Sequence, residues 1–376
     1  MMMRHLRNIY QLGVKELFSL RSDVVMVVLV IYTFTYAVYT PAQQAKTELG
    51  NASVAVVDED HSHLSKRIRD TLLEPYFQPP VSLRTNEIDA AMDSGRYTFV
   101  IDIPPEFEAD ILAGRQPSVQ VNIDATAMTQ AGHGATYIRR AIMQEVEEFI
   151  RGEDTAPWSP VSQVIRVKFN PNLQSRWFLG VMQLVNMITL LAVLLTGAAL
   201  IREREHGTIE HLLVMPLTPA EIMVAKMWAN GLVIAIAAFL SLKLVVQGVL
   251  GIPIAGSISL FMFGVVIHLF AVTALGVFLA TLVRSMPQFG LLAFPVFMIM
   301  ILLSGGITPL DSMPEILQFI MKFAPSTHFV SFAQSILYRG AGFDVVWRDF
   351  ATVALIGAVF FIGALLRFRK SVGETR

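Results

Sequence analysis

The sequence lacks cysteine entirely, in a chain of 376 residues. That absence excludes disulfides, thiolate zinc sites, iron–sulfur clusters and cysteine nucleophiles. Charged residues are also scarce, because Asp, Glu, Lys and Arg make up 16% of the chain, whereas an average soluble domain carries about 25%. The formal net charge is −1, so the chain has no basic field that would attract nucleic acid. These numbers argue against an ordinary soluble enzyme and against a nucleic-acid partner.

Enzymatic motifs are missing as well. The chain contains no G-x-x-x-x-G-K-[ST] phosphate loop, no H-E-x-x-H zinc motif and no G-x-S-x-G nucleophile motif. The run from Asp58 to His63 offers carboxylates and imidazoles to a metal, although such runs after a strand more often form a turn and cap the next helix. We therefore expect no catalytic residue, no metal and no cofactor in this chain.

Apolar residues are abundant and gather in long runs. They make up 54% of the chain, and the mean hydropathy is +0.55. A helix needs about 17–25 mostly apolar residues to cross a bilayer. Six runs are interpreted as transmembrane helices: 24–40, 178–201, 227–247, 259–283, 289–303 and 350–366. The fifth is short and runs into Ser304-Gly305-Gly306, so it resembles a helix that stops early and re-enters. The predicted fold is an α-helical membrane protein with six transmembrane helices.

Lysine and arginine are distributed unevenly among the segments that join these helices. They concentrate in 1–23, 202–226, 284–288 and 367–376. Because positive charges favour the cytoplasmic side of a membrane, we expect both termini in the cytoplasm. The segment 1–23 has its apolar residues roughly on one side and is predicted to be an interfacial helix. The segment 367–376 is predicted to be a cytoplasmic tail.

The segment 41–177 is polar and alternates strand patterns with helix patterns. This order predicts a compact extracytoplasmic α/β domain with a mixed sheet, inserted between the first two transmembrane helices.

The segment 304–349 contains prolines that separate two short outer helices, 315–323 and 329–338. We expect these helices to be re-entrant. Their apolar residues can face the bilayer: Leu317, Ile320, Met321, Phe332, Ile336 and Leu337.

The segment 202–226 carries the most specific pattern. The second transmembrane helix should continue past the membrane and stop at Gly207, and Thr208 can cap a short helix that Pro216 ends. The run Thr218-Pro219-Ala220-Glu221 is a capping box with proline at the first helical position, which opens the third transmembrane helix. A stiff helix held between two transmembrane helices gives a soluble partner a surface to push on.

Residues 202–218 resemble the signature loop of ABC-2 type transporter permeases, the membrane subunits of ATP-driven exporters. The pattern is Arg-Glu-Arg-Glu-x-Gly-Thr-x-Glu-x-Leu-Leu-x-x-Pro-Leu-Thr, and residues 95–108 also resemble the multidrug branch of bacterial inner-membrane permeases. The resemblance implies that the loop carries a coupling helix that docks on a separate ABC ATPase subunit, which holds ATP and Mg. The matching coupling positions are Glu203, Glu205, Gly207, Thr208, Glu210, Leu212 and Pro216. It also implies a location in a bacterial inner membrane and a second permease copy or a paralogue. The plainer reading is a loop whose charges only anchor it among lipid headgroups.

Three polar residues within the predicted transmembrane helices are candidates for a substrate pathway. Gln183 and Asn186 share a face of the second helix, and His268 lies near the middle of the fourth. Such side chains either line a path or hydrogen-bond helices to one another. The predicted helices contain no Asp or Glu, which argues against a transporter coupled to protons or sodium.

The first hypothesis is therefore the permease subunit of an ABC-2 exporter that moves a drug-like or lipidic amphiphile, in contact with membrane lipid. A periplasmic adaptor is a further expected partner. The alternative hypothesis is a membrane receptor or scaffold with an extracytoplasmic ligand-binding domain.

Overall fold

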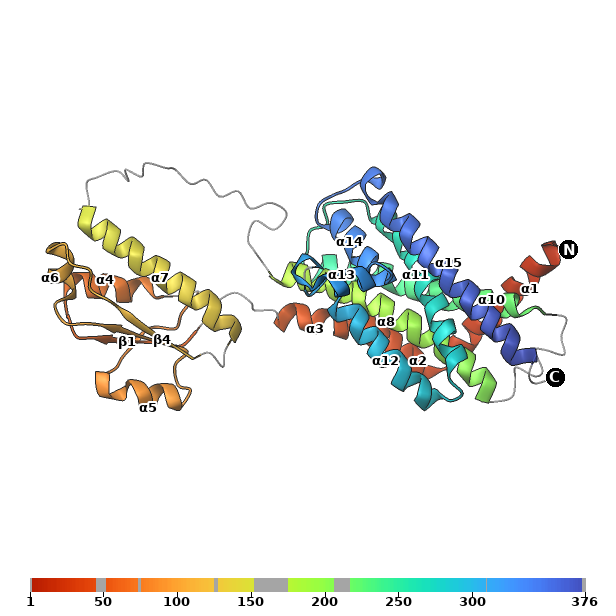
Figure 1. Ribbon diagram of the computed structural model, residues 1–376, viewed down its shortest axis with the longest axis horizontal. Helices are drawn as coiled ribbons and strands as arrows, with labels where there is room; N and C mark the ends of the chain where they lie inside the picture. The colour runs from red at the N-terminus through yellow and green to blue at the C-terminus, as the bar shows by residue number, and fades with distance from the viewer. Residues whose placement is uncertain are drawn as a thin grey trace. The chain divides into compact units, whose positions relative to one another are not determined.

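The computed structural model describes residues 2–44, 52–73, 76–124, 128–151, 175–205, 217–308 and 310–373. The chain forms two compact units (Figure 1). The helical unit combines Met1–Gln44 with Arg176–Arg376, and the α/β unit is formed by Ala45–Ser175. Most of the described structure is helical, as expected for an α-helical membrane protein.

Five helices in the described part of the chain are long and apolar enough to cross a membrane. The first, Val24–Gln43, is interrupted at Thr35 into α2 (Val24–Phe34) and α3 (Tyr36–Gln44). The third joins α10 (Pro219–Leu240) to a π-helix, η2 (Ser241–Val249). The others are α8 (Ser175–Glu205), α11 (Ile258–Leu282) and α15 (Phe343–Gly373). The fifth predicted helix, 289–303, corresponds to α12 (Met286–Leu302), which has 17 residues and falls short of that length.

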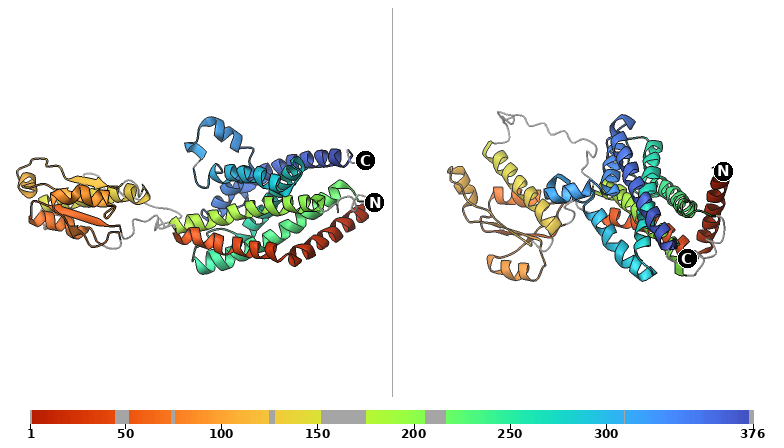
Figure 2. Two further views of the ribbon diagram at one scale, coloured as in Figure 1. Left: turned by 90° about the horizontal axis from the view of Figure 1, so that it is seen from below. Right: turned by 45° about the vertical axis from the view of Figure 1, so that its right-hand side comes forward.

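Helix α15 begins earlier than hydropathy alone predicts. The expected outer segment 304–349 ends inside this helix, which already starts at Phe343 and carries Asp344 and Arg348 in its first two turns. A hydropathy pattern does not predict the first turns of this helix, because the pattern marks only apolar residues. The helical hydrogen bonds continue through the charged residues Asp344 and Arg348. Figures 1 and 2 show α15 running beside α11.

Helix α8 lies at the centre of the helical unit. Within its most apolar window 83% of residues are buried, compared with 22% for the windows of Val24–Gln43 and Phe343–Lys370. Two glycines permit this packing. A Cβ on Gly276 of α11 would lie 2.7 Å from the Val193 carbonyl oxygen of α8, and a Cβ on Gly197 of α8 would overlap the ring of Phe289 from α12. Small residues allow helices to approach this closely within a membrane.

The two short helices of the segment 304–349 are α13 (Glu315–Met321) and α14 (Pro325–Leu337). The prediction that Met321, Phe332, Ile336 and Leu337 face the bilayer is wrong, because all four are buried, whereas Ile320 is 52% exposed. Helix α14 packs against α11 and α15, and its aromatic side chains join the core of the helical unit. A sequence pattern gives the apolar side of a short helix, and only the packing decides whether lipid or protein covers it.

The α/β unit contains a four-stranded sheet with the order β2-β1-β3-β4. The strands are β1 (Val54–Asp58), β2 (Val81–Ser82), β3 (Phe99–Ile103) and β4 (Gln120–Ile123). Strand β1 pairs in parallel with β2 and β3, and β3 pairs antiparallel with β4, so the sheet is mixed as the sequence predicts. The helices of this unit are α4 (His63–Thr71), η1 (Thr85–Glu87), α5 (Ile88–Asp93), α6 (Phe107–Leu112) and α7 (Met128–Arg151). Figure 1 shows α5 on one face of the sheet and α4 and α7 on the other.

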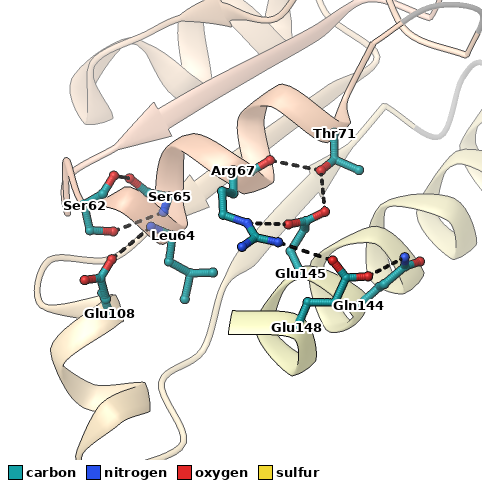
Figure 3. A network of polar contacts seen from close by, with 9 residues as sticks. All are labelled: Ser62, Leu64, Ser65, Arg67, Thr71, Glu108, Gln144, Glu145 and Glu148. Carbon is teal, nitrogen blue, oxygen red and sulfur yellow. Dashed lines mark hydrogen bonds and ion pairs between the residues drawn. The ribbon is translucent and has the colours of Figure 1, made fainter. Parts of the chain in front are cut away.

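An ion-pair network fastens α7 to α4 (Figure 3). The Arg67 guanidinium donates through Nε to Glu145 (2.9 Å) and through Nη2 to Glu148 (3.2 Å). Thr71 Oγ1 donates to the other oxygen of Glu145 (3.1 Å). Helix α7 is thereby held over the sheet on the face that buries Val54, Ile101 and Ile138.

The run from Asp58 to His63 forms a turn and a helix cap. Asp58 Oδ1 accepts from the backbone N–H groups of Asp60 and His61, and its Oδ2 accepts from Ser65 Oγ (2.9 Å). Ser62 caps α4 by accepting from the Ser65 N–H (3.0 Å). These bonds give the run the turn-and-cap role that the sequence also allowed, and in the described ranges no group of three potential ligands is placed to hold a metal.

A histidine ties α14 to α15. His328 Nδ1 faces Asp349 Oδ1 at 3.1 Å, and its Nε2 faces the Lys322 carbonyl oxygen at 3.0 Å. Ser331 Oγ donates to the second oxygen of Asp349 (3.0 Å). Because both ring nitrogens meet acceptors, the protonated imidazole satisfies both contacts. The hydrogen bond to Asp349 raises the pKa of His328 above its ordinary value of 6.5, against the opposing effect of burial.

This contact predicts a pH-dependent stability. A raised native pKa stabilises the fold below 6.5, and that stabilisation is lost as the pH rises through the native value. We expect the unfolding midpoint of the wild type to fall toward that of His328→Gln when the pH is raised from 6.5, measured by intrinsic fluorescence in detergent. The exposed His63 provides the control variant His63→Gln. A constant difference between wild type and His328→Gln at all pH values would contradict the prediction.

Candidate functional site

The candidate coupling site comprises the ends of α8 and α10 and the loop between them. Glu203 and Glu205 lie in the last turn of α8. Gly207, Thr208, Glu210, Leu212 and Pro216 lie outside the described residues, so their roles stay predictions. The geometry of the site is therefore the geometry of the two helix ends that hold the loop.

The run Arg202-Glu203-Arg204-Glu205 contacts four separate parts of the helical unit. Arg202 Nη1 donates to Asp23 Oδ2 (2.8 Å) just before α2, and Glu203 pairs with Lys226 of α10. Arg204 Nη1 donates to the Val283 carbonyl oxygen (2.8 Å) at the end of α11. Glu205 Oε1 accepts from the Met286 N–H (2.9 Å) at the start of α12. Any displacement of this helix end therefore acts directly on four other helices.

Asp23 also caps α2. Its Oδ1 accepts from the Met26 N–H at 3.2 Å. This backbone hydrogen bond, followed by the bond from Arg202, holds the pKa of Asp23 below its ordinary value. The carboxylate is therefore charged at neutral pH and fixes the start of the first membrane helix to the end of α8.

Lys226 is the most buried charge of the site. Its side chain is 2% exposed, and its Nζ lies 3.0 Å from Glu16 Oε1, 2.9 Å from Glu203 Oε2 and 3.3 Å from the Ala199 carbonyl oxygen. Lys15 lies further out, with its Nζ 3.8 Å from Glu203 Oε1. A buried ammonium is tolerated only when it is paired and hydrogen-bonded. Lys226 therefore holds α1 (Met2–Ser22), α8 and α10 together.

A capping box fixes the beginning of α10, and two side chains of α1 contact its glutamate. Thr218 and Glu221 cap the helix reciprocally, as the sequence predicts. Glu221 is 3% exposed, and its Oε1 also meets Asn8 Nδ2 (2.9 Å) and His5 Nδ1 (3.1 Å) of α1. Helix α1 therefore contacts both ends of the loop, through His5 and Asn8 at the start of α10 and through Lys15, which pairs with Glu203, at the end of α8.

Helix α1 lies alongside α10 (Figures 1 and 2). Trp228 Nε1 donates to the Ile9 carbonyl oxygen (3.2 Å), its ring stacks on Tyr10, and Gly13 leaves room for the indole. The large apolar side chains that stay exposed on α1 are Met3, Leu6, Tyr10 and Phe18. Arg4, Arg7, Gln11 and Lys15 are exposed as well, so the interfacial position of this helix stays a prediction.

The three predicted pathway residues separate into two environments. Gln183 and Asn186 lie on a partly exposed stripe of α8 that continues through Leu190 and Leu194, whereas most other positions of this helix are buried. His268 is fully buried, with its Nε2 2.9 Å from Thr189 Oγ1 and its ring stacked on Phe329 at 3.9 Å. The structure therefore places His268 between helices of one protomer and leaves Gln183 and Asn186 at its surface.

Sequence reasoning missed the contribution of α1. Asn8 and Glu16 lie on a helix that the sequence describes only by its apolar side, and their partners are more than 200 positions away. One signal was available, because Lys226 stands alone at the boundary between a charged segment and a long apolar run. A lysine in that position requires a carboxylate partner from elsewhere in the fold.

The Lys226 network predicts a large effect on stability. Lys226→Met removes the ammonium and leaves Glu16 and Glu203 facing each other in a buried site, so we expect a loss of about 3–5 kcal/mol. The measurement is the thermal unfolding midpoint of the purified protein in detergent. Lys243→Met is the matched control, because Lys243 is an exposed lysine in the same membrane helix. Equal midpoints for the two variants would show that the buried network contributes little.

Comparison with known proteins identifies the family of the chain. The family described as "ABC-2 family transporter protein" matches residues 23–366. The chain is 54% identical over 371 residues to the inner membrane transport permease YhhJ of Escherichia coli (strain K12), covering 99% of both chains. It is 28% identical to the probable multidrug ABC transporter permease YbhR of the same strain, over 95% of this chain and 97% of the relative. The chain thus belongs to the ABC-2 family of transporter permeases, the multi-pass inner-membrane subunits that work with an ABC ATPase and do not themselves hydrolyse ATP.

Proposed function

We propose that this permease moves a drug-like or lipidic amphiphile out of the cytoplasm or the inner leaflet, driven by an ATPase subunit that docks on the loop 202–226. The observation that carries the proposal is the four-way contact of residues 202–205. A push on the loop would move the end of α8 and, through it, the ends of α2, α10, α11 and α12. In this proposal Glu203 positions the loop from inside the bundle, and Glu210 belongs to the docking surface.

The pathway would form between two permease copies, or between this chain and a paralogue. The support is the stripe of Gln183, Asn186, Leu190 and Leu194, which is the partly exposed side of an otherwise buried helix. Along this stripe two amide side chains are followed by two leucines, and this order suits a molecule with a polar head and an apolar body. Relatives named as probable multidrug permeases support the same substrate class.

The proposed topology has six transmembrane helices, both termini in the cytoplasm and the α/β unit outside, where a periplasmic adaptor could bind it. Since the chain has no cysteine, single-cysteine variants can test this without a background. Ser94→Cys in the α/β unit should react with a membrane-impermeant maleimide in intact spheroplasts. Gln11→Cys in α1 should react only after the membrane is opened. Labelling of Gln11→Cys in intact spheroplasts would overturn the topology.

Coupling to the ATPase is tested by charge reversal in the loop. Glu210→Arg should abolish the vanadate-sensitive ATP hydrolysis that co-purifies with the permease in mild detergent, because a docking surface rarely tolerates a reversed charge. Glu315→Arg in α13 is the control for the same reversal outside the loop. Unchanged co-purification and hydrolysis with Glu210→Arg would contradict the proposal. Purification without any nucleotidase would favour the alternative, a receptor or scaffold whose α/β unit binds a ligand.

A further inference from the structure

A groove runs along the surface of the helical unit between α10 and α11. It consists of two hollows that share Ala235, one of about 360 Å³ beside Trp228 and one of about 580 Å³ beside Lys243. On α11 the hollows meet between Met262 and Val266, which are about one helical turn apart. We propose that this α10–α11 groove binds an anionic phospholipid, with the phosphate at Lys243 and an acyl chain along the groove. The site goes beyond the proposed function, because it requires neither an ATPase nor a transported substrate.

Lys243 gives the groove a positive charge that the chain does not balance. It is the only Asp, Glu, Lys or Arg in residues 227–283 and the only charged residue that lines either hollow. Among the residues that the structure describes, no carboxylate pairs with its ammonium. A basic group between membrane helices favours the phosphate of an anionic lipid. It also argues against a second copy of the chain as the occupant, because burial of an unpaired ammonium is costly.

The position of Lys243 along its helix suits a lipid headgroup. Helix α10 begins at Pro219, and the segment from there to Lys243 is about 36 Å long at about 1.5 Å a residue. The hydrocarbon core of a bilayer is about 30 Å thick, so the ammonium reaches the headgroup region opposite the loop 202–226. From Lys243 back to Trp228 the groove extends about 22 Å, which exceeds the roughly 15 Å of one leaflet. The groove is therefore long enough for an acyl chain that starts at Lys243.

The π-helix η2 fixes the direction of Lys243. Ser241 Oγ donates to the Phe34 carbonyl oxygen (2.5 Å), where α2 gives way to α3. The neighbouring Leu242 is buried, whereas Lys243 is exposed and Leu244 is 63% exposed. The contact with α2 thus turns the lysine away from the bundle and toward the groove. π-helical turns are rare, and they frequently occur at functional sites.

The first turn of α11 adds further groups for a phosphate. Ser259 lines the same hollow as Lys243. Ser257 caps the helix by accepting from the Leu260 N–H (3.3 Å), and its hydroxyl lies 2.8 Å from Ser259 Oγ. Helix α11 has 25 residues, and its N-terminus is the positive end of the helix dipole. A phosphate here would meet an ammonium, a hydroxyl and a helix N-terminus together.

The rest of the groove is apolar, and the described part of the chain does not fill it. Leu232, Ile236 and Phe239 line it and remain 43%, 53% and 41% exposed. A Cβ on Gly231 would meet nothing nearer than Leu269 Cβ at 4.0 Å, so packing against these neighbours does not require a glycine there. The small side chains of Gly231 and Ala235 leave room that an acyl chain can occupy.

The test is native mass spectrometry of the purified chain, titrated with phosphatidylglycerol or with phosphatidylcholine that carries the same acyl chains. We expect the first phosphatidylglycerol to bind about tenfold more tightly than phosphatidylcholine, as for one hydrogen bond to a charged group. Lys243→Gln should abolish this preference, and Lys243→Arg should retain it. Lys322→Gln removes another exposed lysine, at the end of α13, and is the matched control that should keep the preference of the wild type.

A second variant tests the groove apart from the charge. Ala235→Trp fills the point where the two hollows meet and leaves Lys243 in place. It should weaken binding of both lipids by a similar factor, because both acyl chains lose the same surface. Leu355→Trp adds the same ring at a 66% exposed position of α15 and should leave binding unchanged.

Four results would overturn the inference. These are equal affinity for the two lipids, a preference that survives in Lys243→Gln, and binding that Ala235→Trp does not change. The fourth is displacement of the lipid by excess inorganic phosphate, which would indicate a site for a free anion. The same spectra count the copies of the chain. Lipid on single chains but not on dimers would assign the groove to a second copy and reject the lipid, whereas equal occupancy per chain supports it.

Discussion

The need to pair every buried charge in an apolar surrounding governs the architecture of this permease. Charged groups are few, and the one at the centre of the candidate coupling site, Lys226, is bound by Glu16 from α1 and Glu203 from α8. Since an unpaired ammonium would be expelled from such a position, these three helices must meet. The remaining contacts of the site, from Arg202 to Glu205 and from Asn8 to Glu221, extend the same principle to the neighbouring helix ends.

Rigid contacts at both ends of the loop 206–216 have a mechanical consequence. One end is held by Arg202, Glu203, Arg204 and Glu205, and the other by the capping box of Thr218 and Glu221. Helix α1 bonds to both ends, so a force on the loop meets a connected unit of helices. The proposed coupling would travel through contiguous hydrogen bonds and packed elements, and the described residues at both ends of the loop provide such contacts.

The sequence predicted the positions of strands and long helices in the two units, but it did not predict which helix faces are buried. The mixed sheet followed from alternating apolar residues in 97–103 and 118–124, because strand periodicity is local. The positions of the long apolar helices also followed from the sequence. Helix α15 begins seven residues before the predicted residue 350, because an apolar run ends where charged residues begin although the helix continues through them. The buried faces of α13 and α14 did not follow. Local pattern cannot say whether Phe332 meets lipid or the aromatic core of its own protomer.

The sequence by itself determined the family, the absence of a nucleotide-binding loop and the capping box of α10, since each depends on residues close together in the chain. Tertiary structure alone decided the partners of Glu203, Glu205 and Lys226 and the separation of His268 from Gln183 and Asn186. Those contacts join helices far apart in the sequence. They depend on which helix faces come together, and helix periodicity supplies the faces without supplying their neighbours.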